Sequence, residues 1–579
     1  MIRHFLAWQS VPVPPPPATA FHRSAALQRL AAETFDVLVI GGGITGAGVL
    51  LDAAARGLSA ALVERDDFAS GTSSKSSKLI HGGLRYLQQR ELALVHENLV
   101  ERHRLLHNAP HLVEPLPFLV PLFGKGGVVD ETVARAYSVA LWMYDLAGGW
   151  RIGKRHRRIS ADEIASHMPT LRRDRVVAGF LYYDARADDA RLTLEVVRTA
   201  VLGHGAVACN HAAVVGLVSD GSRRVAGATV AAEGLAQPLE VRARAVVNAT
   251  GVFADEVRSL EQGREEATLR PAKGIHLTVA KHKLPCDVAA VIPVPKDRRS
   301  IFVVPWGEHT YLGTTDTDYD GPLDDPQVDE ADVAYVLGAI NAAVTEPLSP
   351  EDVTGSWAGL RPLLAHSPGR ERQPSARTAD LSRRHRVVVS EGGLVTITGG
   401  KLTTYRKMAE DAVDALAPHL GRLRPCQTRR LQLRGAEPPA RTGGGQQLAA
   451  SWLDEATSAH LRRRYGSEAA AVVGLAEANR ELARPLAPTL PYLRAEALYA
   501  ARYEMATTLD DVLSRRTRAV LLDAAAARQA APDVAGLLGD ELGWDESRRR
   551  AEVARFEQLV APPPWAVGAA VERAEGAAS

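Results

Sequence analysis

A short segment at residues 76–87 carries side chains that could do chemistry, and it reads SSKLIHGGLRYL. It places His81 and Arg85 on either side of a Gly-Gly pair. His81 can accept a proton near neutrality, because the ordinary pKa of histidine is about 6.5. Arg85 offers a fork of N–H donors that suits phosphate oxygens. A histidine beside a Gly-Gly pair is more often structural than catalytic, so the surrounding sequence has to decide between these roles.

A glycine-rich turn upstream supplies that context. Gly41, Gly43 and Gly46 match the pattern GxGxxG between an apolar strand at residues 35–40 and a helix. The first glycine permits the tight turn, the second lets a pyrophosphate approach the backbone, and the third allows close packing of helix on strand. The helix N-terminus adds unpaired N–H groups, and Glu64, which ends the next strand, can accept hydrogen bonds from a ribose. These features predict a dinucleotide-binding unit.

The cofactor domain is expected to be interrupted by insertions. Buried-strand patterns return at residues 245–251 and 393–400, and a helix is predicted over residues 402–416. A domain that binds NAD would usually be more contiguous, so this spacing favours a flavin.

The bulk composition places the chain among folded, multidomain proteins. Its 579 residues are too many for one core and predict two or three domains. The formal net charge of +1 gives no support for nucleic-acid binding, so any anion site must come from local clusters of cations. Cys209, Cys286 and Cys426 are odd in number and widely spaced, which argues against a disulfide framework and a cysteine-based zinc site. We expect no metal, no membrane-spanning helix, and a reducing compartment.

The order of patterns predicts an α/β chain with four parts. Residues 1–33 are expected to form a flexible Pro-rich tail. Residues 34–434 are expected to form the cofactor domain, with a substrate domain of antiparallel strands inserted mainly at 265–390, including strands near 300–305, 310–315 and 386–390. A linker at 435–447 contains Pro-Pro and Gly-Gly-Gly, and the remainder, 448–579, is predicted to be helical.

Several longer motifs carry a family resemblance that covers about residues 34–525. With these motifs the chain resembles the FAD-dependent glycerol-3-phosphate dehydrogenases of the respiratory, membrane-associated type. The motifs are GGGITGAG at 41–48, GTSSKSSKLIHGGLRYL at 71–87, VNATG at 247–251, FVVPW at 302–306, LGTTD at 312–316, GLRPL at 359–363, GGKLTTYRK at 399–407 and LSRRT at 513–517.

The resemblance implies a fold with three parts. These are a Rossmann-like FAD-binding domain of the glutathione-reductase or D-amino-acid-oxidase type, an interleaved antiparallel-sheet substrate domain, and an all-α C-terminal domain. One departure stands out at residues 271–276, where relatives more often have serine at the position of Ile275. Any hydrogen bond that such a hydroxyl would make to cofactor or substrate is therefore in question.

The resemblance also implies an activity. It is the oxidation of sn-glycerol 3-phosphate to dihydroxyacetone phosphate with FAD as hydride acceptor, in glycerol catabolism, with electrons passed to a membrane quinone. It implies a cytoplasmic protein bound peripherally to the anionic inner face of the cell membrane. A homodimer stays open.

The same resemblance implies a set of catalytic and substrate-binding residues. His81 is the first choice for the base that takes the hydroxyl proton, and His276 is the second. Lys401 is expected to stabilise negative charge on the flavin ring. The catalytic set is His81, Arg85, Lys273, His276, Arg361 and Lys401, and the substrate-binding set is Arg85, Tyr86, Lys273, Thr315, Asp316 and Arg361.

The implied cofactor-binding residues come from six separate parts of the chain. They are Gly41, Gly43, Ile44, Thr45, Gly46, Glu64, Arg65, Thr72, Ser73, Ser74, Ser76, Ser77, Lys78, His81, Gly82, Gly83, Leu84, Thr250, Gly251, Gly313, Thr314, Thr315, Gly400, Lys401, Leu402 and Thr403.

Two apolar segments and a basic one are consistent with a membrane surface. Residues 113–123 are apolar and broken by prolines, and residues 140–146 are apolar with aromatics. The sequence RIGKRHRR follows at 151–158. Apolar and aromatic side chains beside a cluster of cations suit an anionic membrane. The alternative is a buried helix followed by a solvated basic loop.

Two other functions remain open at this stage. A glycerol-3-phosphate oxidase, which passes electrons to oxygen and makes hydrogen peroxide, shares nearly all of these motifs. A flavin-binding scaffold without catalysis would bind FAD but would not be reduced by substrate.

Overall fold

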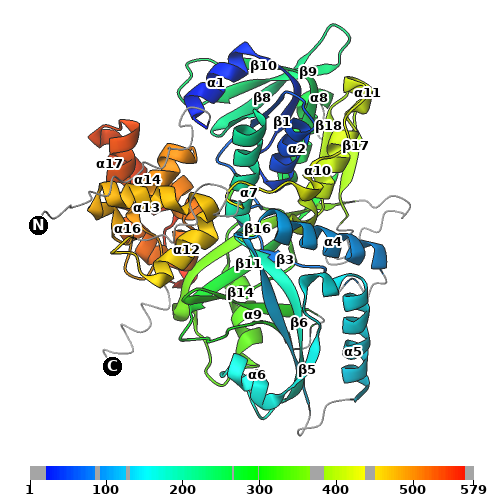
Figure 1. Ribbon diagram of the computed structural model, residues 1–579, viewed down its shortest axis with the longest axis vertical. Helices are drawn as coiled ribbons and strands as arrows, with labels where there is room; N and C mark the ends of the chain where they lie inside the picture. The colour runs from blue at the N-terminus through cyan, green and yellow to red at the C-terminus, as the bar shows by residue number, and fades with distance from the viewer. Residues whose placement is uncertain are drawn as a thin grey trace, which may run out of the picture.

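A computed structural model gives the structure of the chain. It describes residues 21–84, 86, 91–124, 131–263, 267–295, 297, 299–365, 384–436 and 450–566. Arg85, which the sequence predicts as a catalytic residue, lies outside the described residues. Two sheets stacked end to end make up the body of the molecule, and a helical domain packs against one side of both (Figure 1).

The upper sheet in Figure 1 is the predicted cofactor-binding sheet. Its central strands β1 and β2 are continuous apolar runs that are almost completely buried, as expected of parallel strands covered on both faces. The strand order is β17-β18-β10-β1-β2-β7, and the five strands from β18 to β7 are parallel to one another. The antiparallel hairpin of β8 and β9 extends the sheet by pairing β9 with β10. The bounds are β1 Thr34–Ile40, β2 Ala60–Val63, β7 Val207–Cys209, β8 Ala212–Ser219, β9 Val225–Ala232, β10 Leu239–Asn248, β17 Arg386–Val389 and β18 Val395–Thr398.

Helices cover this sheet and close its core. The helix after β1 packs against the helix after β18, so the two segments that the sequence assigned to one domain do meet. The helices around this sheet are α1 Arg23–Ala32, α2 Ile44–Ala55, α7 Asp189–Arg198, α8 Ala254–Gln262, α10 Tyr405–Asp414 and α11 Ala417–Leu420.

Part of the expected N-terminal tail is folded, which corrects the prediction for residues 23–32. This segment forms α1, which lies against β7 and buries Leu30 completely and Ala26 nearly so. The short helix has a weak amphipathic pattern, and its stability comes from packing on the sheet rather than from its own propensity.

The lower sheet is the predicted substrate sheet, and it draws on more of the chain than expected. Among the described residues it has ten strands, in the order β15-β11-β14-β13-β12-β4-β6-β3, with β16 on β11 and β5 on β6. Strands β3 to β6 come from well before residue 265. The bounds are β3 Leu79–Ile80, β4 Val113–Phe123, β5 Arg157–Ser160, β6 Val176–Ala187, β11 Leu269–Ala280, β12 Ala289–Pro293, β13 Ser300–Trp306, β14 His309–Gly313, β15 Thr317–Asp318 and β16 Val353–Leu364.

Two predicted strands have a different place from the one expected. The strand near residues 386–390 is β17, which pairs with β18 at the edge of the cofactor sheet and not with the substrate sheet. The proline-broken segment 113–123 is β4, which lies between β6 and β12 with most of its apolar side chains buried, so it is not a membrane-facing element. Alternation of apolar residues shows that a segment is a strand, but it does not name the neighbouring strand.

Four helices flank the substrate sheet. One of them, α5, carries its apolar side chains on two opposite faces, and its outer face is exposed at the edge of the molecule. Among the described residues, no helix is both long and apolar enough to cross a bilayer. The four helices are α4 Leu92–Asn108, α5 Glu131–Leu146, α6 Ala161–His167 and α9 Glu330–Asn341.

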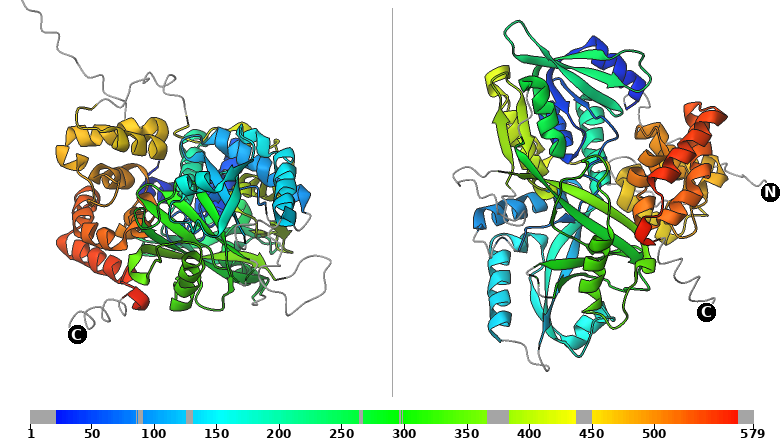
Figure 2. Two further views of the ribbon diagram at one scale, coloured as in Figure 1. Left: turned by 90° about the horizontal axis from the view of Figure 1, so that it is seen from below. Right: turned by 180° about the vertical axis from the view of Figure 1, so that it is seen from behind.

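The C-terminal domain is helical in the described region 450–566. It packs against β11 and β16 of the lower sheet and against α7 of the cofactor domain, and it lies along one side of the molecule in the views from below and behind (Figure 2). Buried arginines make many of its contacts: Arg515 and Arg516 both donate to the buried carboxylate of Asp67, just after β2. Its helices are α12 Glu455–Tyr465, α13 Ala469–Ala478, α14 Arg494–Tyr503, α15 Ala519–Leu522, α16 Ala524–Leu542 and α17 Glu546–Leu559, with a π-helical turn at Asp511–Arg516.

The packing of α1 leads to a stability prediction. We expect Leu30→Ala to lower the free energy of unfolding by about 2–5 kcal/mol, because a buried leucine leaves a cavity when truncated. Gln28→Ala on the exposed side of the same helix should change it by less than about 0.5 kcal/mol. Urea unfolding followed by far-UV circular dichroism measures both. Equal midpoints for the two variants would show that α1 is not part of the folded core.

Candidate active site

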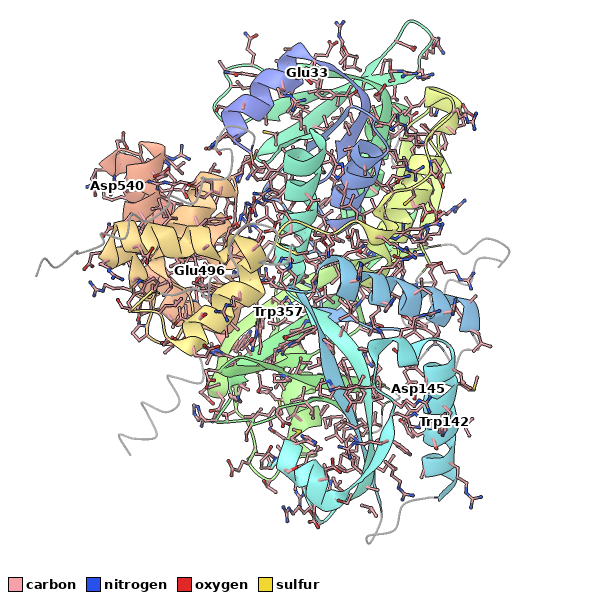
Figure 3. All side chains as sticks on the ribbon, in the orientation of Figure 1. Glu33, Trp142, Asp145, Trp357, Glu496 and Asp540 are labelled. Carbon is pink, nitrogen blue, oxygen red and sulfur yellow. The ribbon has the colours of Figure 1, made fainter. Side chains whose placement is uncertain are left out.

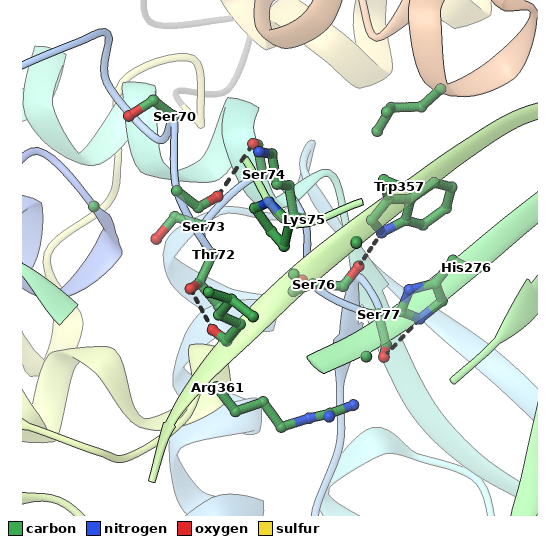
Figure 4. A pocket seen from close by; sticks show the side chains of 18 of the residues that line it. Ser70, Thr72, Ser73, Ser74, Lys75, Ser76, Ser77, His276, Trp357 and Arg361 are labelled. Atoms are coloured by element: carbon green, nitrogen blue, oxygen red, sulfur yellow. Dashed lines mark hydrogen bonds between the residues drawn. The ribbon is translucent and has the colours of Figure 1, made fainter. Parts of the chain in front are cut away.

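A large cavity lies where the two sheets and the helical domain meet. Its volume is about 1550 Å³, and its walls come from the glycine turn, residues 70–77, the ends of β11 and β16, and the segment 399–403. Figure 4 shows residues 70–77 running along one wall toward His276, with Arg361 below them. We call residues 72–78 the serine loop.

The glycine turn forms one end of this cavity. Gly41 has φ +107°, a conformation that favours glycine, and a Cβ on Gly46 would overlap the carbonyl oxygen of Gly41. The N–H of Ile44, in the first turn of α2, donates to Ser73 Oγ at 2.8 Å. Backbone N–H groups at a helix N-terminus thus face a wall of hydroxyl groups, which suits a pyrophosphate.

Glu64 closes the same end from β2. Its carboxylate accepts from the N–H of Gly42 at 2.5 Å and from the N–H of Asp66 at 2.9 Å. Burial raises the pKa of Glu64, and the two backbone N–H groups act in the opposite direction. Arg65, the next residue, also lines this end of the cavity and forms ion pairs with Asp66 and Asp324.

The serine loop is fixed by contacts from several directions. Thr72 Oγ1 donates to the carbonyl of Leu360 at 2.6 Å, and Ser76 Oγ donates to Asp189 Oδ2 at 2.7 Å. Lys78, which the sequence predicts to bind the cofactor, is not among the residues that line the cavity. Its ammonium lies 3.3 Å from Asp189 and 4.4 Å from the ring centre of Trp357, and burial lowers its pKa to about 8. Lys78 therefore supports the loop from behind.

His276 on β11 is the buried histidine of the cavity. Its Nε2 lies 2.9 Å from Ser77 Oγ, and its ring stacks on Trp357 with centroids 4.8 Å apart. Its Nδ1 is buried and has no hydrogen-bond partner among the described residues. Burial lowers the pKa of His276 well below its usual value, and the charges of Lys78 and Arg361 add to this effect. His276 is thus a neutral imidazole that can accept a proton.

Arg361 is one of two predicted cations on the substrate sheet, and several hydrogen bonds hold its side chain. Arg361 on β16 lines the cavity, with Nη2 at 3.0 Å from Thr314 Oγ1 and 3.0 Å from the carbonyl of Thr315. Nη1 lies 3.2 Å from Asp316 Oδ1. These contacts hold the guanidinium in place at the cavity wall.

Lys273, a predicted substrate contact, is not among the residues that line the cavity. Its ammonium lies 2.7 Å from Asp329 and 2.7 Å from Asp332, at the N-terminus of α9. Burial alone would lower the pKa of Lys273, but the hydrogen bonds with these two carboxylates raise it. The charge of Lys273 is therefore matched by acids of the fold.

The segment 399–403 brings Lys401 to the opposite wall. Lys401 precedes the short turn Leu402–Thr404, and its ammonium lies 3.8 Å from the ring centre of the buried Tyr86. The Thr403 hydroxyl accepts from the N–H of His81 at 3.2 Å, so His81 and Lys401 share this wall.

Most of the predicted site residues lie together in this cavity. Gly46, Lys78, Gly82, Lys273 and Gly313 are not among its lining residues. The predicted residues that line it are Gly41, Gly43, Ile44, Thr45, Glu64, Arg65, Thr72, Ser73, Ser74, Ser76, Ser77, His81, Gly83, Leu84, Tyr86, Thr250, Gly251, His276, Thr314, Thr315, Asp316, Arg361, Gly400, Lys401, Leu402 and Thr403.

The isoleucine at position 275 does not disturb the site. Ile275 is fully buried in the core of the substrate sheet, on the face away from His276, and only its N–H contributes, by donating to Thr315 Oγ1 at 3.1 Å. The missing hydroxyl would point into apolar packing.

Sequence reasoning missed several residues of the cavity. Trp357 stacks on His276, and its Nε1 donates to the carbonyl of Ser76 at 3.1 Å. Asp184 accepts from the N–H of Gly82 at 3.1 Å and from Tyr144. Trp357 stands two residues before the GLRPL motif, which could have indicated it; Asp184 stands in no motif.

One arm of the cavity is apolar. It is lined by Leu84, Phe118, Tyr137, Val291 and Phe302, which belong to a single apolar cluster. Tyr137 comes from α5, so this arm ends behind the helix at the edge of the molecule. The cavity therefore joins a polar region rich in hydroxyl and N–H groups to an apolar one.

The residues present fit an FAD. The cavity runs from Glu64, past the N-terminus of α2 and the hydroxyls of the serine loop, to the wall of His81 and Lys401. That order matches a ribose, a pyrophosphate and a flavin ring in turn. A Cβ at Gly43 would lie 3.1 Å from Ser73 Oγ, so the lack of a side chain there lets the glycine turn lie close to the serine loop.

Family models match most of the chain. The model described as FAD dependent oxidoreductase matches residues 36–406. A second, described as the C-terminal domain of alpha-glycerophosphate oxidase, matches residues 426–549.

Similar proteins carry names that agree with the first of these models. Glycerol-3-phosphate dehydrogenase 2 of Mycobacterium tuberculosis is 41% identical over 539 residues, covering 92% of this chain and 89% of that protein. The mitochondrial glycerol-3-phosphate dehydrogenase of Mesocricetus auratus is 38% identical over 538 residues, covering 90% and 72%. The X-ray structure of glycerol-3-phosphate dehydrogenase from Bacillus halodurans, complexed with FAD, has a TM-score of 0.74 at 31% identity and covers 94% of this chain and 98% of that one.

Proposed function

The chain belongs to the FAD-dependent oxidoreductases and, within them, to the glycerol-3-phosphate dehydrogenase family, and from this premise we propose that it oxidises sn-glycerol 3-phosphate to dihydroxyacetone phosphate. The predicted fold class, family and cofactor are thereby confirmed. The observation that carries the proposal is that the guanidinium of Arg361 and the neutral imidazole of His276 line one cavity.

Arg361 is suited to the phosphate of the substrate. It is a permanent cation at the cavity wall, and its fork of donors is already oriented by Asp316 and Thr314. A pre-oriented arginine binds a phosphate with little loss of side-chain entropy. In this proposal Lys401, on the opposite wall, supplies the second positive charge, and Arg85 remains a predicted contact.

His276 is suited to take the proton from the substrate hydroxyl. Oxidation of an alcohol at carbon removes a hydride and a proton, and bound FAD supplies the acceptor for the hydride. His276 is neutral, buried and has a free Nδ1, so it can accept the proton without first losing one. We therefore propose His276 as the base, whereas the sequence placed His81 first.

The apolar arm of the cavity supports a quinone as the electron acceptor. A quinone is a large apolar molecule, and its ring needs an apolar path to the flavin. The arm lined by Phe118, Tyr137 and Phe302 offers such a path and ends behind α5. An oxidase needs access only for oxygen, which is small, so this arm favours a quinone dehydrogenase. Such an activity would place the chain in glycerol catabolism.

The outer face of α5 supports a membrane surface at the end of that arm. Val139, Trp142, Met143 and Leu146 are 59%, 50%, 40% and 76% exposed, and Trp142 lies at the edge of the molecule in Figure 3. Most of the basic segment 151–158 that follows is also exposed. In the arrangement we propose, this face contacts the anionic inner leaflet of the cell membrane as a peripheral, cytoplasmic protein does.

Anaerobic reduction of the flavin tests the activity. We expect sn-glycerol 3-phosphate to bleach the flavin absorbance of the purified holoenzyme at about 450 nm, because the reduced ring loses that band. Glycerol without phosphate should leave the band unchanged at the same concentration. If the colour persists with excess substrate, the chain is a flavin-binding scaffold. Peroxide formation faster than quinone reduction after air is admitted would identify an oxidase.

The role of Arg361 gives a kinetic prediction. Arg361→Ala should lower kcat/KM for glycerol 3-phosphate by roughly 10- to 150-fold, mostly through KM, because a charged hydrogen-bond pair contributes about 1.5–3 kcal/mol. Arg270→Ala is the matched control, since Arg270 lies on the adjacent strand β11 and pairs with Asp318 outside the cavity. Equal kinetics for the two variants would remove Arg361 from the substrate site.

The membrane contact of α5 gives a binding prediction. The double variant Trp142→Ala, Leu146→Ala should bind vesicles of anionic phospholipid about 10- to 100-fold more weakly, because it loses apolar area that would enter the interface. Leu260→Ala, an exposed leucine on α8 that is 43% accessible, is the control. Co-sedimentation measures the binding. Reduction of a water-soluble acceptor should be unchanged in both, and unchanged vesicle binding of the double variant would contradict the proposed surface.

A further inference from the structure

A buried arginine of the helical domain reaches the back of the serine loop. Arg518, which precedes α15, is completely buried and has the left-handed φ of +70°. Its Nη2 donates to the carbonyl of Ser74 and lies 3.1 Å from Asp189 Oδ1. Arg518 belongs to the part of the cavity wall that the C-terminal domain supplies, and it holds the serine loop through the Ser74 carbonyl.

Asp189 joins this arginine to the rest of the loop. The carboxylate is fully buried at the N-terminus of α7 and accepts from the N–H of Ser76 at 3.0 Å and from its hydroxyl at 2.7 Å. Lys78 lies 3.3 Å from the same carboxylate and donates to the carbonyl of Ser74 at 3.1 Å. Arg518 also lies 3.5 Å from Asp188 Oδ1, so two carboxylates, the cations Arg518 and Lys78, and the loop residues Ser74 and Ser76 form one network.

The network continues to the proton acceptor. Ser76 is followed by Ser77, whose hydroxyl lies 2.9 Å from His276 Nε2 and whose carbonyl accepts from Tyr311 at 2.8 Å. The Ser77 hydroxyl is thus the contact through which the serine loop holds the ring of His276. A shift of the loop at Ser74 or Ser76 would therefore move both the flavin wall and the imidazole.

The charge of Arg518 stabilises the buried carboxylate of Asp189. Three neutral donors and two cations contact the carboxylate of Asp189, and removal of one cation leaves a buried charge partly unmatched. Such a loss costs several kcal/mol in low dielectric, and the chain relieves it by moving the loop or admitting water. Either response displaces groups that contact the cofactor.

We propose that Arg518 is a positioning residue through which the C-terminal domain completes the active site. It fixes the serine loop through Ser74 and Asp189, and through Ser77 it orients His276. The part that concerns His276 rests on the proposed function. The part that concerns cofactor binding depends only on FAD, which the serine loop lines.

The test compares Arg518 variants with a matched control in the holoenzyme. Arg518→Met should raise the FAD dissociation constant about 10-fold or more and lower kcat about 10-fold or more, with KM for glycerol 3-phosphate within about 3-fold of the original. Arg518→Lys keeps the charge but not the fork, so its effects should be smaller. Arg191→Met is the control, because Arg191 is equally buried and joins the same two domains through Glu504 without touching the serine loop.

A double-mutant cycle separates positioning from simple domain docking. In a Ser77→Ala background, Arg518→Met should lower kcat by less than about 3-fold, because its route to His276 is already cut. Arg191→Met should keep its full effect in that background. Additive losses for Arg518 and Ser77, or equal losses for Arg518→Met and Arg191→Met, would overturn the proposal.

Two further experiments test the proposal if Arg518→Met does not fold or if the protein does not oxidise glycerol 3-phosphate. If Arg518→Met does not fold, Arg518→Lys and Ser76→Ala replace it, since Ser76→Ala removes one hydrogen bond to Asp189 and leaves the charges in place. Normal FAD affinity and kcat in both would overturn the proposal. If the original protein is not reduced by glycerol 3-phosphate, the proposed function fails, and the FAD dissociation constants alone then decide whether Arg518 fixes the loop.

Discussion

The buried carboxylate of Asp189 is the interaction on which the geometry of the active site depends. A carboxylate without solvent is stable only when cations and hydrogen-bond donors surround it. Here Lys78 and Arg518 supply the cations, and the backbone and hydroxyl of Ser76 supply the donors. The serine loop has therefore one arrangement that satisfies every partner. The cofactor site takes its shape from that requirement.

Similar side chains serve different ends in this site because their surroundings differ. Lys273 and Arg361 lie at adjacent register positions of paired strands, and so on opposite faces, because Lys273 pairs with Leu360 and Ala272 with Arg361. Lys273 turns to the two carboxylates at the start of α9 and is neutralised there, while Arg361 turns to the cavity and keeps its donors near Thr314 and Asp316. Register on a strand sets the face that a side chain occupies, and an acid holds each of these cations: Lys273 pairs with two carboxylates at the start of α9, and Arg361 pairs with Asp316 at the cavity wall.

Local sequence patterns predicted much of the fold and less of the site. The glycine turn, the strands around it and Glu64 follow from chemistry within a few residues, so they could be predicted. The partners of Lys78 and Lys273 could not, because Asp189 and Asp332 lie far away in sequence and are brought near only by the fold. The same holds for β17, whose apolar alternation indicates a strand but not its sheet, and for α1, which is stabilised by β7. Long-range pairing is a property of the whole chain.

Under the proposed function, the cavity would keep proton transfer apart from electron transfer to an apolar acceptor. Proton transfer needs polar groups, and these gather around His276, Ser77 and Arg361. Transfer to an apolar acceptor needs a path without water, and Phe118 and Phe302 line one on the side of α5. A flavin between the two regions can meet the substrate on its polar side and the acceptor from its apolar side. The stacking of His276 on Trp357 contributes to the polar side, because the indole helps to bury the imidazole, and burial favours its neutral form.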